Sequence, residues 1–272
     1  MPETTIHPTA DVSPNAVLGE GVRIGPFAVI DDGAVIGDGT VIEAFVRLTP
    51  YVRVGRNCHI YDGVILGQPP QDHDFGGETS YVVIGDDVVL RAGVTIHRAT
   101  GEGQVTGVGR GSLLMEGCHL GHNVRIGECC TLTNKVGLSG HVQMGDYVVA
   151  GGFAGFHQFV RVGSYAMVGG MAKIVMDVPP YSLVDGNPAS MYGLNAVGLR
   201  RRGFSQAQRT RIKEIYRTLF EAAASLEDGI ALIGERYADD GFAREIATFV
   251  GNSKRGVYHW HPGAAEHRGR KK

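Results

Sequence analysis

The 272-residue chain has only four cysteines, and no two of them form a CxxC pair. This number and spacing exclude a disulfide scaffold and a cysteine-based zinc motif. Glycine is abundant, at 41 residues, but neither a Gly-X-Y period nor the proline content of collagen accompanies it. No apolar run reaches the roughly 18 residues of a membrane-spanning helix, and no signal-peptide pattern opens the chain. We therefore expect a cytoplasmic protein without a membrane span.

The chain also lacks a strong excess of either charge, because its formal net charge is only −2. The charges are unevenly spread, however. Residues 1–199 hold 11 Lys and Arg against 19 Asp and Glu, whereas residues 200–272 hold 15 against 9. A basic segment of this kind could bind nucleic acid, an anionic membrane surface or an acidic protein. It could equally be a basic face that contacts only solvent. Charge alone leaves these alternatives open.

What the sequence does have is an apolar ladder with a period of six. Of the 28 positions at every sixth residue from Val12 to Ile174, 25 are apolar, and the exceptions are Asp72, Glu78 and Glu102. Six residues are too few to fold alone, so one hexapeptide per side of a prism and about three per coil is the sensible geometry. The sequence resembles the left-handed parallel β-helix of hexapeptide-repeat acyltransferases. The predicted fold class is therefore mainly β, and its hand comes from that resemblance, since crossover rules favour the opposite hand.

Two segments interrupt the ladder, and a different pattern follows it. Residues 68–81 and 99–107 are polar and rich in Gly or Pro, as expected of loops that leave a corner while the coil beneath stays in register. Beyond the ladder, Ser205 and Gln208 form a capping-box pattern that predicts a helix, with further helices behind it. The chain thus ends in an α-helical segment.

The predicted domain organisation follows from these patterns. We place a β-helix acyltransferase domain at residues 1–190 and a helical C-terminal domain at residues 191–272. The end of the latter, from Gly251 to Lys272, is predicted to fray.

The ladder does not explain four histidines in the middle coils: His119, His122, His141 and His157. Their places relative to the ladder predict that several project outward, where neighbouring coils can line one groove. A single surface histidine is usually just exposed, but four on adjacent coils favour a functional groove. Zinc would need three or four converging ligands, and the His-x4-His pair of hexapeptide-repeat carbonic anhydrases is missing, so no metal is expected. A neutral imidazole acting as general base for acyl transfer suits the cluster better.

A more specific resemblance rests on eight stretches of sequence. They are PQDHDFGGE (70–78), VTIHRAT (94–100), LLMEGCHLGHN (113–123), LSGH (138–141), HQF (157–159), DVPPY (177–181), GNPA (186–189) and GLRRRGFS (198–205). In this order, across most of the chain, they resemble the UDP-N-acetylglucosamine O-acyltransferase (LpxA) family. The resemblance implies transfer of an R-3-hydroxyacyl chain from acyl carrier protein to the glucosamine 3-position of UDP-N-acetylglucosamine, the first step of lipid A biosynthesis. It also implies a homotrimer with active sites between subunits, no nucleic-acid partner and no cofactor beyond the acyl-phosphopantetheine donor of the carrier protein.

The same resemblance assigns roles by position. His122 would be the general base, and the backbone N–H of Gly140 would stabilise the oxyanion, since glycine allows a close backbone approach. The predicted substrate-binding residues are Asp72, His119 and His141 for the sugar, His157 and Gln158 towards pantetheine and nucleotide, and Asn195 and Arg201 for UDP. Without the resemblance, Arg201 would be interpreted as a solvent-exposed member of the Arg200-Arg201-Arg202 run. The basic C-terminal segment would steer the acidic carrier protein.

Gly170 would set the acyl length, although it is otherwise simply a corner glycine of the repeat. A glycine there leaves room, so family analogy predicts a chain of about fourteen carbons.

This chain departs from the family pattern at four positions. Asn123 replaces the usual aspartate after His122, Asp74 replaces a lysine, Lys135 replaces an asparagine and Val197 replaces a glutamate. The alternatives are therefore a related hexapeptide acyltransferase acting on a 3-amino or other sugar nucleotide, and a β-helix trimer that has lost catalysis.

Overall fold

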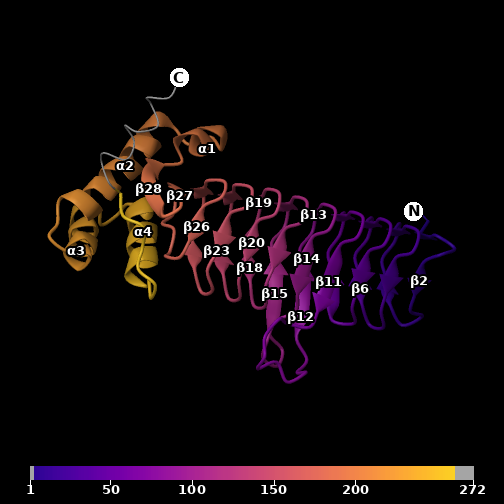
Figure 1. Ribbon diagram of the computed structural model, residues 1–272. Helices are drawn as coiled ribbons and strands as arrows, with labels where there is room; N and C mark the ends of the chain where they lie inside the picture. The colour runs from indigo at the N-terminus through magenta and orange to yellow at the C-terminus, as the bar shows by residue number, and fades with distance from the viewer. Residues whose placement is uncertain (1–2, 261–272) are drawn as a thin grey trace.

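Short strands recur every six residues through most of the protein, as the apolar ladder predicts. The computed structural model describes residues 3–260. In Figure 1 the strands form a long prism that runs from the N-terminus to a group of helices at the other end. Most strands pair in parallel with the strand 18 residues later, as Arg23 does with Val41, so three hexapeptides make one coil. The predicted β-helix with a helical C-terminal segment is confirmed.

Three sheets form the sides of the prism. The first contains β1 (Thr5–Ile6), β4 (Arg23–Ile24), β7 (Val41–Ile42), β10 (His59–Ile60), β13 (Val89–Leu90), β16 (Leu113–Leu114), β19 (Thr131–Leu132), β22 (Val149–Ala150), β25 (Met167–Val168), β27 (Ser182–Gly186) and β28 (Ala189–Leu194). The second contains β2 (Asp11–Val12), β5 (Val29–Ile30), β8 (Arg47–Leu48), β11 (Ile65–Gln68), β14 (Thr95–His97), β17 (His119–Leu120), β20 (Gly137–Leu138), β23 (Gly155–Phe156) and β26 (Lys173–Ile174). The third contains β3 (Val17–Leu18), β6 (Val35–Ile36), β9 (Val52–Val54), β12 (Tyr81–Ile84), β15 (Val105–Val108), β18 (Arg125–Ile126), β21 (Gln143–Met144) and β24 (Arg161–Val162).

The ladder residue of each strand points into the prism, and the residue before it points out. Ile30 is 1% exposed, whereas its neighbour Val29 is only partly buried, because successive strand residues face opposite sides of a sheet. The residue two places before the ladder position is also inside, as Val22 and Ala28 show. Aliphatic layers thus fill the core, and the outward strand positions and the corners remain for function.

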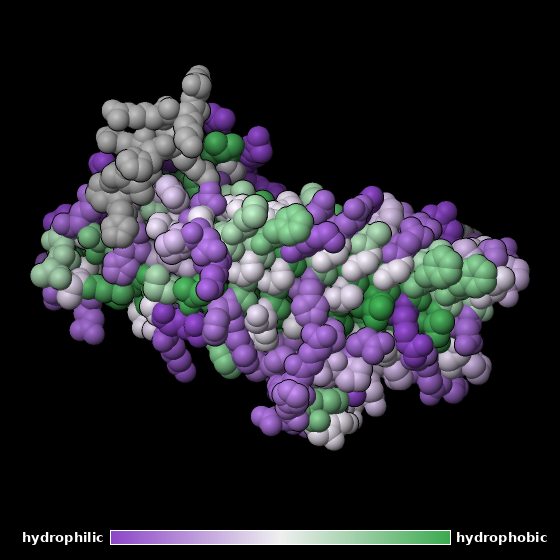
Figure 2. All heavy atoms as spheres, in the orientation of Figure 1, coloured by the Kyte–Doolittle hydropathy of each residue, from purple (hydrophilic) through white to green (hydrophobic). Residues whose placement is uncertain are grey.

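Both predicted loops leave the prism next to each other. The strands β12 and β15 that border them pair over four residues, from Tyr81 opposite Val105 to Ile84 opposite Val108. The second loop therefore ends earlier than predicted, since residues 105–107 are strand. The loops project below the prism in Figure 1, and in Figure 2 this projection is mostly hydrophilic.

The coils end in an antiparallel pair, β27 and β28, and four helices follow within the described residues up to Trp260. The helices are α1 (Ala196–Arg201), α2 (Gln206–Glu221), α3 (Leu226–Arg236) and α4 (Gly241–Gly251). The predicted capping box is present, because the Ser205 side chain accepts from the Gln208 backbone and the Gln208 side chain accepts from the Ser205 backbone. The sequence patterns missed α1. The predicted domain boundary at residue 190 falls within β28 and stays a prediction.

The segment after α4 does not fray as predicted between residues 252 and 260. Val257 forms a parallel bridge with Asp177, and the Tyr258 hydroxyl accepts a hydrogen bond from the backbone of Val175. Tertiary contacts with the last coil therefore order a stretch that lacks a regular pattern of its own. The rest of the predicted frayed end, residues 261–272, lies outside the described residues. Within residues 3–260, no helix is long and apolar enough to cross a membrane.

Candidate active site

The histidine region lies along the second sheet and the corner that joins it to the third sheet. His119 is the outward residue of β17, in register with Thr95 on one side and Gly137 on the other. His122 follows in the first position of the next turn. Gly140 and Gln158 stand 18 and 36 residues later, so they occupy the same corner position in the next two coils. The repeat itself therefore stacks these residues.

A groove of about 380 Å³ runs along this part of the surface. It is lined by Gln71, His97, His119, Gly121, His122, Gly137, Leu138, Ser139, Gly140, Gly155, Phe156 and Gln158. Gly137 and Gly155 take the outward positions of β20 and β23, and a Cβ added to either would meet nothing within 4 Å. Two adjacent outward positions without side chains leave the floor of the groove open.

The His122 imidazole is held from both sides. Its Nδ1 lies 2.9 Å from Oδ1 of Asn123, and its Nε2 lies 3.7 Å from Oδ2 of Asp72. Its side chain is 12% exposed, enough to be reached from the groove. The ring also meets His141 edge-on, with ring centroids 5.1 Å apart. The imidazole is thus fixed in place with one nitrogen towards the groove side.

Gly140 lies directly against this ring. A Cβ on Gly140 would stand 2.3 Å from Nε2 of His122 and 2.5 Å from Cε1, far inside van der Waals contact. The backbone N–H of Gly140 has no acceptor among the described residues. Other corner amides of the fold share that feature, but Gly140 also has the open side of its Cα, where a Cβ would stand, against a histidine nitrogen. A backbone donor beside a base is the arrangement that an oxyanion needs.

Burial lowers the pKa of two neighbouring histidines. The pKa of His119 is lowered by desolvation and then by His97, whose ring meets it edge-on at 5.1 Å. The pKa of His141 is lowered by desolvation and by His122, against an opposing effect of Asp72. The groove therefore favours neutral imidazoles.

These lowered pKa values predict a loss of stability in acid. Below about pH 6.5, the ordinary pKa of histidine, the unfolded chain binds protons that folded His119 and His141 resist, so acid favours unfolding. We expect the Tm to fall between about pH 7.5 and pH 5.5, and to fall less in His119→Gln and His141→Gln. Thermal unfolding across that range measures the slopes, with His7→Gln, at an exposed site, as the control. Equal slopes in all four proteins would contradict the prediction.

The structure brings some of the other predicted residues to this groove. Asp72 reaches His122 from the first loop, and Gln158 lines the groove. His141 does not line the groove, but its ring meets His122 and stacks on Phe159, with centroids 4.8 Å apart. His157 is exposed, and its Nδ1 contacts the backbone oxygen of Gln158 instead.

Three predicted residues lie elsewhere in the chain. Asn195 caps α1, and its amide bonds the Gly198 N–H and the Tyr165 carbonyl. Arg201 is exposed near the end of α1, and Gly170 lies at the corner between the first and second sheets. None of the three lines the groove. The helix α1 directly follows β28, a strand of the first sheet, whereas the histidine corner lies between the second and third sheets.

Sequence reasoning missed two residues that the fold brings to this region. His97 lines the groove, although it was only part of a quoted stretch. Thr100 bonds Asn123 by its backbone and its side chain. Thr100 was also part of the stretch VTIHRAT (94–100), but loop residues of this kind follow no period, so no pattern in the sequence gave it a role. Among residues 3–260, no three His, Cys, Asp or Glu side chains are grouped so that they could hold a metal ion.

Comparisons with known proteins agree with this geometry. The family model for bacterial transferase hexapeptide repeats matches residues 33–68, and the model for domain 2 of UDP-N-acetylglucosamine O-acyltransferase matches residues 177–258. An acyl-(acyl-carrier-protein)–UDP-N-acetylglucosamine O-acyltransferase of Halorhodospira halophila is 40% identical over 255 residues, which are 93% of this chain and 99% of that protein.

Solved structures give the same result. The UDP-N-acetylglucosamine acyltransferase of Francisella novicida matches with a TM-score of 0.91 at 34% identity, over 96% of each chain. LpxA from Acinetobacter baumannii matches with a TM-score of 0.89 at 33% identity, over 93% of this chain and 99% of that one.

A hexapeptide-repeat β-helix with a corner histidine set against a corner glycine defines an acyltransferase of the hexapeptide-repeat class. Within that class, the identity over nearly the whole chain is decisive. The chain belongs to the UDP-N-acetylglucosamine O-acyltransferase family.

Proposed function

We propose that this protein transfers an R-3-hydroxyacyl chain from acyl carrier protein to the glucosamine 3-hydroxyl of UDP-N-acetylglucosamine, as the first step of lipid A biosynthesis. The family membership supports the reaction. The observation that supports it in this chain is the closeness of Gly140 to the His122 ring, where a Cβ would stand 2.3 Å from Nε2. We propose that His122 is the base and the Gly140 N–H the oxyanion donor.

In the proposed reaction, Nε2 of His122 takes the proton of the sugar hydroxyl while its oxygen attacks the thioester carbonyl. The Gly140 N–H donates to the oxyanion that forms. Collapse breaks the carbon–sulfur bond, and the imidazolium returns its proton to the thiolate. The products are the ester and the free phosphopantetheine thiol, so no other reactant is required.

Substrate contacts are proposed from the middle coils and from the helical end of the molecule. Asp72, His119 and His141 would hold the sugar, with His157 and Gln158 towards pantetheine and nucleotide. Asn195 and Arg201 stand outside the groove of their own chain, so they would bind UDP at the groove of a neighbouring copy. This separation supports a homotrimer with active sites between subunits.

The helical end offers a basic surface for the carrier protein. Arg200, Arg209 and Lys213 line a pocket of about 410 Å³ together with residues of β28 and Trp260. An acidic carrier protein would be steered to such a surface. We place the reaction in the cytoplasm, as the sequence predicts.

The test is product analysis with the full chain. UDP-N-acetylglucosamine and its 3-amino analogue are each incubated with 3-hydroxyacyl carrier proteins of several lengths and with the matching coenzyme A thioesters. We expect an alkali-labile ester on UDP-N-acetylglucosamine from the carrier-protein donors, detected by mass spectrometry. Product on the amino sugar alone would identify the related N-acyltransferase instead, and no product from any pair would support a trimer that has lost catalysis.

Acyl length is predicted to depend on Gly170. Its corner is exposed, and a Cβ there would approach the Gly152 backbone, with the carbonyl oxygen at 3.2 Å and the nitrogen at 3.7 Å. We expect a preference for about fourteen carbons, and Gly170→Met should shift it to about ten, because a bulky side chain shortens the space for the chain. The measurement is the acyl profile of the product from mixed donors. A wild-type profile that peaks at ten carbons or fewer would contradict the prediction.

A further inference from the structure

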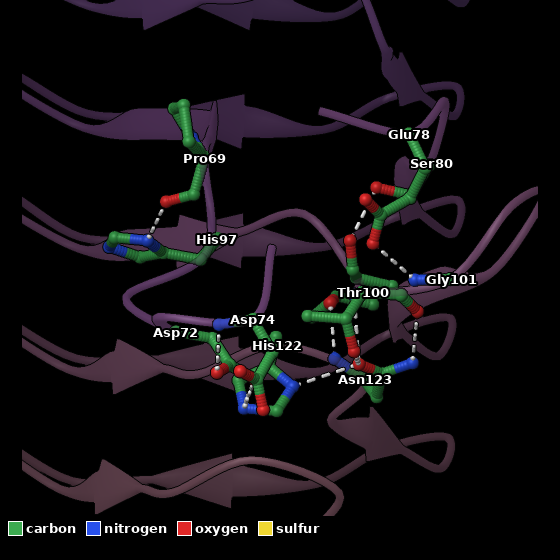
Figure 3. Close-up of polar contacts among 12 residues, drawn as sticks. Pro69, Asp72, Asp74, Glu78, Ser80, His97, Thr100, Gly101, His122 and Asn123 are labelled. Carbon is green, nitrogen blue, oxygen red and sulfur yellow. Dashed lines mark hydrogen bonds and ion pairs between the residues drawn. The ribbon is translucent and has the colours of Figure 1, made fainter. Parts of the chain in front are cut away.

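Asn123, the residue after His122, hydrogen-bonds a loop that lies outside the hexapeptide repeat. Asn123 lies in the left-handed region, with a φ of 59°, and its backbone N–H donates to Oγ1 of buried Thr106 at 2.9 Å. Its side chain reaches across to Thr100, in the loop between β14 and β15. Figure 3 shows this amide between Thr100 and the His122 ring.

Thr100 contacts both ends of the Asn123 amide. The Thr100 backbone N–H and Oγ1 donate to Oδ1 of Asn123 at 3.0 and 2.9 Å, and Nδ2 of Asn123 donates to the Thr100 carbonyl at 3.0 Å. A backbone N–H can only donate, and a carbonyl oxygen can only accept. Turning the amide over would set donor against donor and acceptor against acceptor. The partners therefore fix which amide atom faces the loop N–H.

The fixed amide determines where the neutral imidazole carries its proton. Oδ1 of Asn123 can only accept, and it lies 2.9 Å from Nδ1 of His122, so Nδ1 must carry the hydrogen. The lone pair of the neutral ring is then on Nε2. The Asp72 carboxylate, 3.7 Å from Nε2, is too distant for a direct hydrogen bond that would hold a proton there.

The loop that carries Thr100 is itself anchored. Glu78 accepts from the Gly101 N–H at 2.7 Å and from the Gly76 N–H at 2.9 Å, so one carboxylate joins the two loops (Figure 3). Glu102 accepts from the Thr79 N–H at 3.0 Å. Thr100 therefore cannot move back from Asn123 without breaking contacts in both loops.

We infer that Thr100 is a positioning residue, which orients the Asn123 amide and thereby sets the Nδ1–H tautomer of His122. The inference rests on the proposed role of His122 as base. Asn123 is then matched to the loop, because an aspartate in the same orientation would place an anionic oxygen 3.0 Å from the Thr100 carbonyl with no proton between them. Restoring the carboxylate that the family usually has should impair this chain.

The decisive variant is Asn123→Asp, compared with Asn123→Ala and with a control. We expect the kcat of both variants at position 123 to be about tenfold below wild type, with KM within about twofold of wild type. The kcat of Asn123→Asp should be no higher than that of Asn123→Ala. The control is Asn57→Asp, because Asn57 has nearly the same backbone conformation, with a φ of 53°, on an exposed corner away from the groove. It should retain full activity. An Asn123→Asp enzyme as active as wild type, or more active, would overturn the inference.

A spectroscopic measurement separates this inference from the proposed function. Ring ¹⁵N shifts of labelled histidine, assigned with His122→Gln, report the tautomer in mildly alkaline solution without any substrate. We expect Nδ1 protonated and Nε2 free in wild type, with that preference lost in Asn123→Ala, which has no acceptor for Nδ1–H. An Nε2–H tautomer in wild type would refute the role of Thr100 even if acyl transfer is observed. The expected tautomer without any acyl transfer would count against the proposed function alone.

Discussion

His122→Ala should lower kcat/KM by about a thousandfold while the protein stays folded. General-base catalysis typically contributes between about a hundredfold and ten-thousandfold, and the His122 ring supplies the three atoms nearest to a Cβ placed on Gly140. The side chain is at a corner rather than in the aliphatic core, so its removal leaves the ladder unchanged. The loss should appear in kcat with every acyl donor that wild type accepts.

The measurement is the initial rate of acylated sugar nucleotide formation. The matched control is His7→Ala, because His7 is exposed in the first coil and its side chain hydrogen-bonds nearby Thr9. That variant should keep the wild-type rate, and circular dichroism should show the same β signal in both. A rate for His122→Ala within about threefold of the control would exclude His122 as the base.

Gly140→Ala should cost at least about a hundredfold in kcat, although it adds a single methyl group. The new Cβ would stand 2.3 Å from Nε2 of His122, a distance that real Cβ atoms essentially never show, so the imidazole must move. Gly140 does not have a positive φ, and alanine can therefore adopt its backbone conformation. The loss thus comes from displacing the base and crowding the oxyanion position, where one donor is worth about a hundredfold or more.

Gly107→Ala is the control for this change. Gly107 is an outward residue of β15 in the third sheet, and a Cβ there would lie in ordinary contact, 3.7 Å from Cδ of Arg125. We expect wild-type kcat for Gly107→Ala and a similar Tm for both variants. If Gly140→Ala remained fully active, the contact between Gly140 and His122 could not be the catalytic arrangement.

Much of the candidate site follows from the repeat itself. A coil takes 18 residues, so His122, Gly140 and Gln158 had to stack at one corner once the period was known. The same period predicts the outward positions of His119 and of the glycines that follow it. Roles for these residues remain predictions that the experiments above will test.

The sequence could not predict where the two loops that interrupt the coils would place their side chains. Asp72 and Thr100 sit in loops that leave the period, and their places depend on hydrogen bonds between loops, such as those of Glu78. The predicted fraying after Gly251 failed for a similar reason, since Val257 and Tyr258 are ordered by the last coil rather than by local pattern.

By itself, the sequence determined the β-helix, its corners and the capped helix at its end, because each arises from contacts that repeat every coil or lie within one helical turn. Only the tertiary structure decided which loop atoms meet the His122 ring, that α1 stands apart from the groove in its own chain, and that the Asn123 amide has one orientation. Those features depend on hydrogen bonds between segments 20 or more residues apart outside the repeat, such as Thr100 with Asn123, which no periodic pattern encodes.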